Sequence, residues 1–289
     1  MSPRMSTSKL YEIIYLIRPH QWYKNLLVFL ALLFSQNLMN QDLAMQSMLA
    51  FVAFCLMSSA NYVVNDLFDS SRDRLNPEKR RRPIASKKIS RMEASAIASG
   101  LFMLSLGFAA LNSSLLVVVL LLFFGLTLSY SSYIKHIPFV ELFFVAINFV
   151  VRAVGGAVAI SVYISPWLII GTFFLALFVI IGKRKAEFGL TSCKRFRRVM
   201  CSYSSKMLSY GAYAVLAVLV CCYTLYTIFV FRRLVVTIPL FVLILSLYTY
   251  HIIKEDKLAR HPHLMVTDFY FVSAVMLTLI SITILLYLS

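Results

Sequence analysis

An amide and three carboxylates follow a long apolar stretch at helical spacing: Asn65, Asp66, Asp69 and Asp73. The carboxylates stand at i, i+3 and i+7, so on a helix they project from one face and could share a hard cation through oxygen ligands. A solvated helix end is the alternative, but like charges at this spacing repel one another unless something cationic lies among them. We therefore predict that the three carboxylates bind magnesium. Asn65 could orient a carboxylate or ligate the metal through its carbonyl oxygen.

Basic residues come directly after these carboxylates. Magnesium together with cationic side chains can neutralise a diphosphate, so this segment predicts a diphosphate site at a membrane surface. A polybasic loop that touches anionic lipid would explain the cations alone, but not the carboxylates. The candidate phosphate ligands in this segment are Arg72, Lys79 and Arg82.

The segment 130–141 repeats this theme more weakly. Its one carboxylate is Glu141, so a second metal clamp built like the first is not available there. Tyr130 and Lys135 are interpreted as donors to a phosphate; a polar turn anchored by interfacial tyrosines is the alternative.

Arg152 lies inside an otherwise apolar stretch. An arginine in the middle of a membrane span costs about 2.5 to 3.5 kcal/mol on insertion scales, so we expect it to face the bundle interior and meet an anion. The alternative is an internal salt bridge to Glu141 or Glu187.

Two further segments could add cations to the same cavity. Lys183 and Arg184 end an apolar stretch and could reach a phosphate, although Lys183 could instead pair with Glu187 one turn away. Arg18 and Lys24 precede the first apolar stretch, among aromatic residues suited to the headgroup layer.

The elements that must position these residues are membrane helices. The chain has 289 residues, 60% of them hydrophobic, and a mean hydropathy of +0.81, which is far outside the range of soluble domains. We predict an all-α, polytopic bundle and one transmembrane domain over residues 1–289, in which residues 1–24 form a cytoplasmic interfacial segment. No cleavable signal peptide is expected. Windows of roughly 20 apolar residues give about nine spans, near 25–41, 43–65, 93–111, 115–131, 139–160, 164–182, 208–230, 234–253 and 267–288.

The net charge of +16 would suggest nucleic acid in a soluble protein, but here it sorts by membrane side. Of the 28 lysines and arginines, 25 fall on one face of the predicted spans. The positive-inside rule then predicts a cytoplasmic N-terminus, an external C-terminus and no nucleic-acid partner. Nearly every acidic residue shares the cytoplasmic side, so we expect the active cavity to open there, in the inner (plasma) membrane.

The motif Asn-Asp-x-x-Asp-x-x-x-Asp at the end of the second span resembles the UbiA superfamily of intramembrane prenyltransferases. Three further motifs look like its decaprenyl-phosphate phosphoribosyltransferase branch, and the resemblance runs from about residue 18 to 268. These motifs are Arg18-Pro19-x-Gln21-Trp22-x-Lys24-Asn25, then Asn76-Pro77-x-Lys79-x-x-Arg82-Pro83-Ile84-Ala85, and finally Lys183-Arg184-x-x-Glu187.

The resemblance implies a UbiA-like fold and magnesium-dependent transfer of 5-phosphoribose from phosphoribosyl diphosphate to a polyprenyl phosphate, for arabinose donors of cell-wall polymers. It leaves a homo-oligomer open. On this hypothesis Asp66 and Asp69 bind magnesium, and Asp73 is a further ligand or supports the others. The substrate phosphates would meet Lys79, Arg82, Lys183 and Arg184, and the lipid phosphate would meet Lys135 and Arg152.

The sequence departs from this branch at two places. Glu141 stands where the branch usually has Asp, and Thr249 precedes Tyr250 where the branch has an Arg-Tyr pair. Two other functions stay open. Ordinary prenyl transfer from a polyprenyl diphosphate typically uses two Asp-rich clamps, and a transporter would carry ionisable residues across the membrane midplane.

Overall fold

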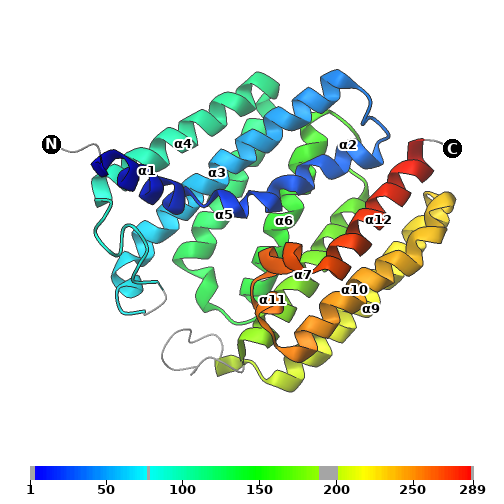
Figure 1. The fold of residues 1–289 in the computed structure, drawn as a ribbon. Coiled ribbons are helices and arrows are strands. Elements are labelled where there is room, and N and C mark those ends of the chain that lie inside the picture. Colours follow the sequence, from blue (N-terminus) through cyan, green and yellow to red (C-terminus); the bar gives the residue numbers. More distant parts are fainter. Residues whose placement is uncertain (1–3, 77–78, 189–200, 288–289) are drawn as a thin grey trace. The chain divides into compact units, whose positions relative to one another are not determined.

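The computed structural model describes residues 4–76, 79–188 and 201–287, and this part of the chain contains helices and no β-strand (Figure 1). Eight of its helices are long and apolar enough to cross a membrane. This confirms the predicted all-α, polytopic membrane fold. These eight helices are α3 (Gln41–Asp73), α4 (Arg91–Asn112), α5 (Ser114–Ser132) continued by η2 (Ile134–His136), α6 (Val140–Ala159), α7 (Pro166–Phe188), α9 (Ser205–Phe229), α10 (Ile238–Lys254) preceded by η4 (Arg232–Thr237), and α12 (Phe269–Tyr287).

Residues 25–41, the first predicted span, do not form one long α-helix. The described chain therefore has eight long apolar helices where nine were predicted. The region forms a 3-10 helix, η1 (Pro19–Phe29, 11 residues), followed by the short helix α2 (Leu30–Phe34, 5 residues). Its apolar run extends only over residues 26–34, between Asn25 and Ser35. Because a 3-10 helix rises about 2.0 Å per residue, η1 and α2 together measure roughly 30 Å, but their apolar residues account for only about half of that length.

The described chain divides into two compact units, which are considered separately. The first unit contains Met1–Leu32, Asn40–Lys135 and Val154–Val162, and the second contains Leu33–Met39, His136–Ala153 and Tyr163–Ser289. The single domain predicted over residues 1–289 stays a prediction.

In the first unit, α3 and α4 lie side by side (Figure 1), and α3 also packs against α5 and η1. Small residues allow one very close approach. A Cβ on Gly156, near the end of α6, would lie 2.0 Å from the carbonyl oxygen of Val28 in η1. The packing of α6 against η1 therefore depends on the absence of a side chain at Gly156.

Polar caps determine where the loop that carries the cations ends. The Ser90 hydroxyl accepts from the Glu93 backbone N–H, and the Glu93 carboxylate accepts from the Ser90 N–H, which is a complete capping box at the start of α4. Glu93 also pairs with Lys9 of α1 (Arg4–Ile17) at 2.6 Å, and Lys88 pairs with Glu12. These contacts attach the N-terminal helix to the start of α4.

In the second unit, α7 packs against α9 and α10, and α10 packs against α12. A polar junction joins the end of α10 to the beginnings of α11 (Lys257–Arg260) and α12. There the ring of His251 lies between Asp256, at 2.6 Å from Nδ1, and Asp268, at 3.3 Å from Nε2. Asp268 also accepts from the backbone N–H of Phe271 at 2.7 Å, as expected of a residue that begins a helix.

Candidate functional site

The carboxylate row of α3 is paired with cations that come from three other segments of the first unit. Asp66 is only 2% exposed, and both of its oxygens accept from Nη2 of Arg18, at 2.5 and 2.7 Å. Nη1 of Arg82 lies 2.9 Å from Asp66 and 2.8 Å from Asp73, so one guanidinium nitrogen bridges two carboxylates. Lys135 donates to both oxygens of Asp69, at 2.7 and 2.9 Å. We call these six residues the charge cluster.

Local structure brings Arg18 to α3. Arg18 lies between α1 and η1 in the left-handed conformation, with φ 52°, which turns the chain sharply there. Its guanidinium lies 5.2 Å from the ring centroid of Tyr62. The indole N–H of Trp22 donates to Ser59 at 3.0 Å, and the Ser59 hydroxyl donates to the carbonyl of Ile17 at 2.8 Å. These bonds hold the start of η1 against α3.

The loop between α3 and α4 supplies Arg82. The backbone N–H of Ser86 donates to the carbonyl of Arg82 at 2.8 Å, and Arg74 donates to the carbonyl of Ala85 at 3.3 Å. Ile84 and Ile89 are buried with residues of α1, α3 and α4. The loop is therefore packed onto the helices, and this packing positions the guanidinium of Arg82 beside the carboxylates.

The donor chemistry of the charge cluster suits magnesium. In the described ranges no group of three or more His, Cys, Asp and Glu side chains is close enough to hold a metal ion, since cations lie between the carboxylates. Asp66 and Asp73 nevertheless place hard oxygen atoms around a single point, the Nη1 atom of Arg82, and magnesium prefers such atoms. These two residues therefore fit the predicted metal.

The other predicted residues of the first unit lie around this region with fewer described contacts. Asn65 and Tyr130 are half-buried, and Arg72 and Lys79 are exposed. Lys24 places its ammonium 5.9 Å from the ring centroid of Tyr23. Their predicted roles in substrate binding stay predictions.

Glu141 and Arg184 form a buried pair in the second unit. Nε and Nη2 of Arg184 donate to the two carboxylate oxygens of Glu141, at 2.8 and 2.9 Å. Nη1 of Arg184 donates to Glu187 at 2.8 Å, and Lys183 pairs with Glu187 at 3.8 Å, as its spacing of four residues suggested. Two glutamates thus surround Arg184, which favours a structural role over the predicted phosphate contact.

Tyr203 completes this pair, and the sequence reasoning did not find it. Its hydroxyl accepts from the backbone N–H of Phe139 at 3.0 Å and donates to Glu141 at 3.4 Å. Burial is the main cause that raises the pKa of Tyr203, so the phenol stays protonated and can donate. No sequence motif identifies Tyr203, because its partners Phe139 and Glu141 lie more than 60 residues earlier in the chain.

Arg152 is buried in α6 and belongs to the second unit. Nη1 donates to the carbonyl of Asn148, one turn earlier, at 2.6 Å, and the guanidinium lies 5.4 Å from the ring centroid of Phe149. Both glutamates proposed as its internal partners, Glu141 and Glu187, are bonded to Arg184. The predicted contact of Arg152 with a substrate anion stays a prediction.

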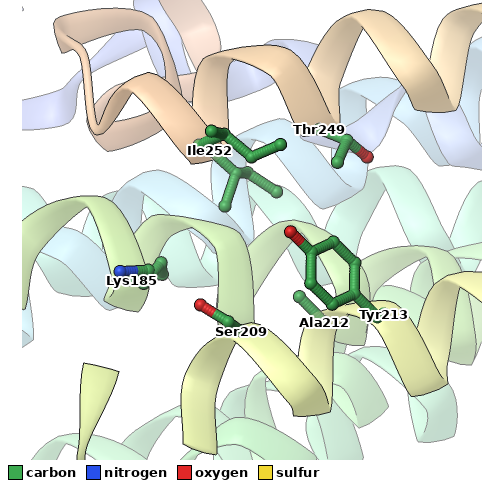
Figure 2. A pocket seen from close by; sticks show the side chains of 7 residues that line it. Lys185, Ser209, Ala212, Tyr213, Thr249 and Ile252 are labelled. Carbon is green, nitrogen blue, oxygen red and sulfur yellow. The ribbon is translucent and has the colours of Figure 1, made fainter. Parts of the chain in front are cut away.

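Figure 2 shows a small pocket between α7, α9 and α10, with a volume of about 150 Å³. Ligand sites usually measure about 300 to 1,000 Å³, so this pocket is too small for a polyprenyl lipid. The amino group of Lys185 pairs with Glu255 at 2.6 Å. One lining residue is Thr249, which stands where the resembled branch has Arg. The pocket is lined by Lys185, Ser209, Ala212, Tyr213, Thr249, Ile252 and Ile253.

Comparison with known proteins identifies relatives over most of the chain. The sequence model described as "UbiA prenyltransferase family" matches residues 25–275. A decaprenyl-phosphate phosphoribosyltransferase of Mycolicibacterium smegmatis is 33% identical over 220 residues, which are 74% of this chain and 69% of the relative. The enzyme of the same name from Mycobacterium tuberculosis is 33% identical, over 74% of this chain and 73% of its own length. That from Corynebacterium glutamicum is 38% identical over 59% of this chain and 53% of its own length.

Solved structures share the fold. A UbiA homolog from Archaeoglobus fulgidus bound to GPP and Mg²⁺ has a TM-score of 0.73 at 20% identity, and the match covers 95% of this chain and 99% of the homolog. A digeranylgeranylglyceryl phosphate synthase structure has a TM-score of 0.67 at 17% identity, and the match covers 98% of this chain and 100% of the other.

Proposed function

This chain belongs to the UbiA prenyltransferase family, and from this premise we propose that it transfers 5-phosphoribose from 5-phosphoribosyl 1-diphosphate to a polyprenyl phosphate. The resemblance drawn from the sequence motifs and the similarity to enzymes named decaprenyl-phosphate phosphoribosyltransferase agree on this reaction. Because the chain belongs to a family of transferases, the transporter alternative has little support.

The state of Glu141 is the observation that carries the proposal. Prenyl transfer with two carboxylate clamps would require this residue to help hold a second metal. Instead, Glu141 is the single carboxylate of the segment 130–141 and is bonded to Arg184, whereas α3 carries three carboxylates at helical spacing. The charge cluster is then the site at which the diphosphate of a single donor is expected.

The reaction needs little proton chemistry. A phosphate monoester has a second pKa of about 6, so the lipid phosphate is mostly dianionic at neutral pH and is itself the nucleophile. One of its oxygens forms a bond to C1 of the ribose, and the bond between C1 and the diphosphate oxygen breaks, so that diphosphate leaves with the electron pair. No general base is required.

The harder task is to bring two anions together. Asp66 and Asp73, with Asp69 as a further proposed ligand, would hold magnesium, which when bound neutralises charge on the leaving diphosphate. In the same unit, Arg18, Arg82 and Lys135 present N–H donors that suit phosphate oxygens. Lys79, Lys183 and Arg152 stay proposed phosphate ligands. Donors fixed in advance near developing negative charge lower the barrier because they need not reorient during the reaction.

We further propose that this site faces the cytoplasm in the plasma membrane. The charge asymmetry of the connecting segments supports this orientation. Phosphoribosyl diphosphate is a soluble, highly charged metabolite, so its transferase must meet it at an aqueous face of the membrane.

The test uses membranes that contain this protein, with ribose-labelled phosphoribosyl diphosphate, polyprenyl phosphate and magnesium. We expect label to enter the organic phase as a lipid product, and to be lost on addition of a chelator or with Asp69→Ala. Asp42→Asn changes an acidic residue at the other end of the same helix and should leave the product yield unchanged.

Ordinary prenyl transfer is the competing function, because solved relatives of this fold were obtained with GPP and with DMAPP. The same membranes are therefore incubated with a labelled polyprenyl diphosphate and an aromatic acceptor. Prenylated acceptor, together with no ribose label in lipid, would replace the proposed reaction with this one.

A further inference from the structure

A buried amide nitrogen without a hydrogen-bond partner lies one turn before the carboxylate motif of α3. Asn61 is 4% exposed, and its Nδ2 atom has no hydrogen-bond partner among the described residues. Asn61, Asn65 and Asp69 stand at i, i+4 and i+8, so they form one row along the helix. The amide therefore extends the polar row of the charge cluster about 6 Å farther along the helix axis from Asn65.

Two contacts show that α5 runs alongside this part of α3. Seven residues before Asn61, the ring of Phe54 lies 5.4 Å from that of Phe123 in α5. Eight residues after Asn61, Asp69 pairs with Lys135, which follows α5 directly. By helix register Asn61 therefore lies about level with the turn Thr127–Tyr130 of α5.

The environment makes an unpaired amide unfavourable. Burying an amide donor without an acceptor costs free energy, and an apolar side chain of similar size would avoid that cost. A buried donor that keeps no internal partner is therefore suited to an acceptor atom brought by a bound molecule.

We propose that Asn61 donates a hydrogen bond to a ring hydroxyl oxygen of the pentosyl donor. This inference rests on the proposed function and deepens it. With the diphosphate at the carboxylates, the next part of a phosphoribosyl donor carries hydroxyl oxygens, whereas the next part of a prenyl diphosphate is hydrocarbon and carries no acceptor. Asn61 is then a specificity residue for a sugar donor.

The test compares steady-state kinetics of Asn61→Leu and the unmodified protein. Loss of one hydrogen bond should raise KM for phosphoribosyl diphosphate about three- to tenfold, with KM for polyprenyl phosphate unchanged. The thermal unfolding midpoint in detergent should stay equal or rise, because the unpaired amide is removed. Asn61→Ala serves as a second variant in case the leucine does not fit.

Donor analogues that lack the hydroxyl at C2 or at C3 identify the contact. With the unmodified protein, one of these analogues should show a KM about three- to tenfold higher than that of phosphoribosyl diphosphate. With Asn61→Leu, the analogue and phosphoribosyl diphosphate should have the same KM. The matched control is Ser47→Ala, which also removes a buried, unpartnered polar atom from α3, but at its other end. This variant should leave both KM values unchanged.

The outcomes separate the two proposals. If the unmodified protein forms phosphoribosyl lipid and the Asn61 variants keep its KM for the donor, the inference about Asn61 is wrong and the proposed function stands. If the unmodified protein forms no such lipid, both are overturned.

Discussion

Each carboxylate of the charge cluster has a cation as its partner, and the three acids face three bases. The cluster is therefore close to neutral without any ligand. A divalent metal adds positive charge to it, and a diphosphate adds negative charge. We expect the metal and the phosphate substrate to bind with positive cooperativity, since each offsets the charge of the other.

Asp66 should be essential for turnover, because it is the acid that contacts two of the three bases. We expect Asp66→Ala to lower the transfer rate by at least about 100-fold while the protein still inserts in the membrane. The measurement is the rate of phosphoribosyl lipid formation per milligram of folded protein, with Asp42→Asn as control. Activity within a fewfold of the unmodified protein would remove the metal-binding role of Asp66.

The Glu141–Arg184 pair should act chiefly on stability. Arg184→Met leaves a buried carboxylate without its partner, which costs about 3 to 5 kcal/mol. Replacing both residues, as in Glu141→Leu with Arg184→Leu, removes both charges and should recover most of that loss. The measurement is the thermal unfolding midpoint of Arg184→Met and of the double variant in detergent. A double variant less stable than Arg184→Met would contradict this account.

Among the described helices, η1 in the first predicted span packs very closely against its neighbour α6. The 3-10 helix η1 reaches farther per residue than an α-helix and passes close to α6 at Gly156. The atoms nearest to a Cβ on Gly156 all belong to the backbone of Val28, and backbone cannot move aside as a flexible side chain can. The glycine is therefore required by packing at this position.

Gly156→Ala should separate η1 from α6 and reduce the yield of folded protein, because overpacking of this kind typically costs about 1 to 3 kcal/mol. Gly125→Ala is the matched control, since a Cβ on Gly125 in α5 meets nothing within 4 Å. The comparison uses the monodisperse fraction in size-exclusion chromatography and the unfolding midpoint. Equal behaviour of the two variants would show that the close approach to Val28 can relax.

For the whole molecule, the number of crossings decides which side of the membrane holds the C-terminus. Eight crossings would place both termini on one side, and nine would place them on opposite sides. The combined length of η1 and α2, roughly 30 Å, matches a ninth crossing only if the polar residues 19–25 are counted with the apolar residues 26–34. The distribution of lysine and arginine favours nine, with the N-terminus inside.

We therefore expect a reporter that is active only outside the cytoplasm to be active when fused after Ser289 or within the segment 36–40. A reporter that fluoresces only in the cytoplasm should be bright when inserted after Lys87. The decisive reporter is one at the N-terminus, because α3 and the seven later helices fix the other three positions relative to one another. An N-terminus on the external side would show that η1 and α2 do not cross the membrane.

The membrane class, the positions of eight long helices and the row of carboxylates on α3 could all be predicted from the amino-acid sequence. These features depend on local quantities: the length of an apolar run must match the bilayer, and helical spacing fixes which side chains share a face. The pairing of Lys183 with Glu187 was found for the same reason, because the two residues stand one turn apart.

The pairing of charges, in contrast, depends on how distant segments pack. Arg18 and Asp66 are 48 residues apart, and Glu141 and Arg184 are 43 apart, so no local pattern could pair them. The same holds for Tyr203, and for the buried amide of Asn61, whose lack of a partner depends on what surrounds it. Side-chain chemistry states what a residue can bind, but the packing of distant segments determines whether its partner is a neighbouring side chain or a substrate.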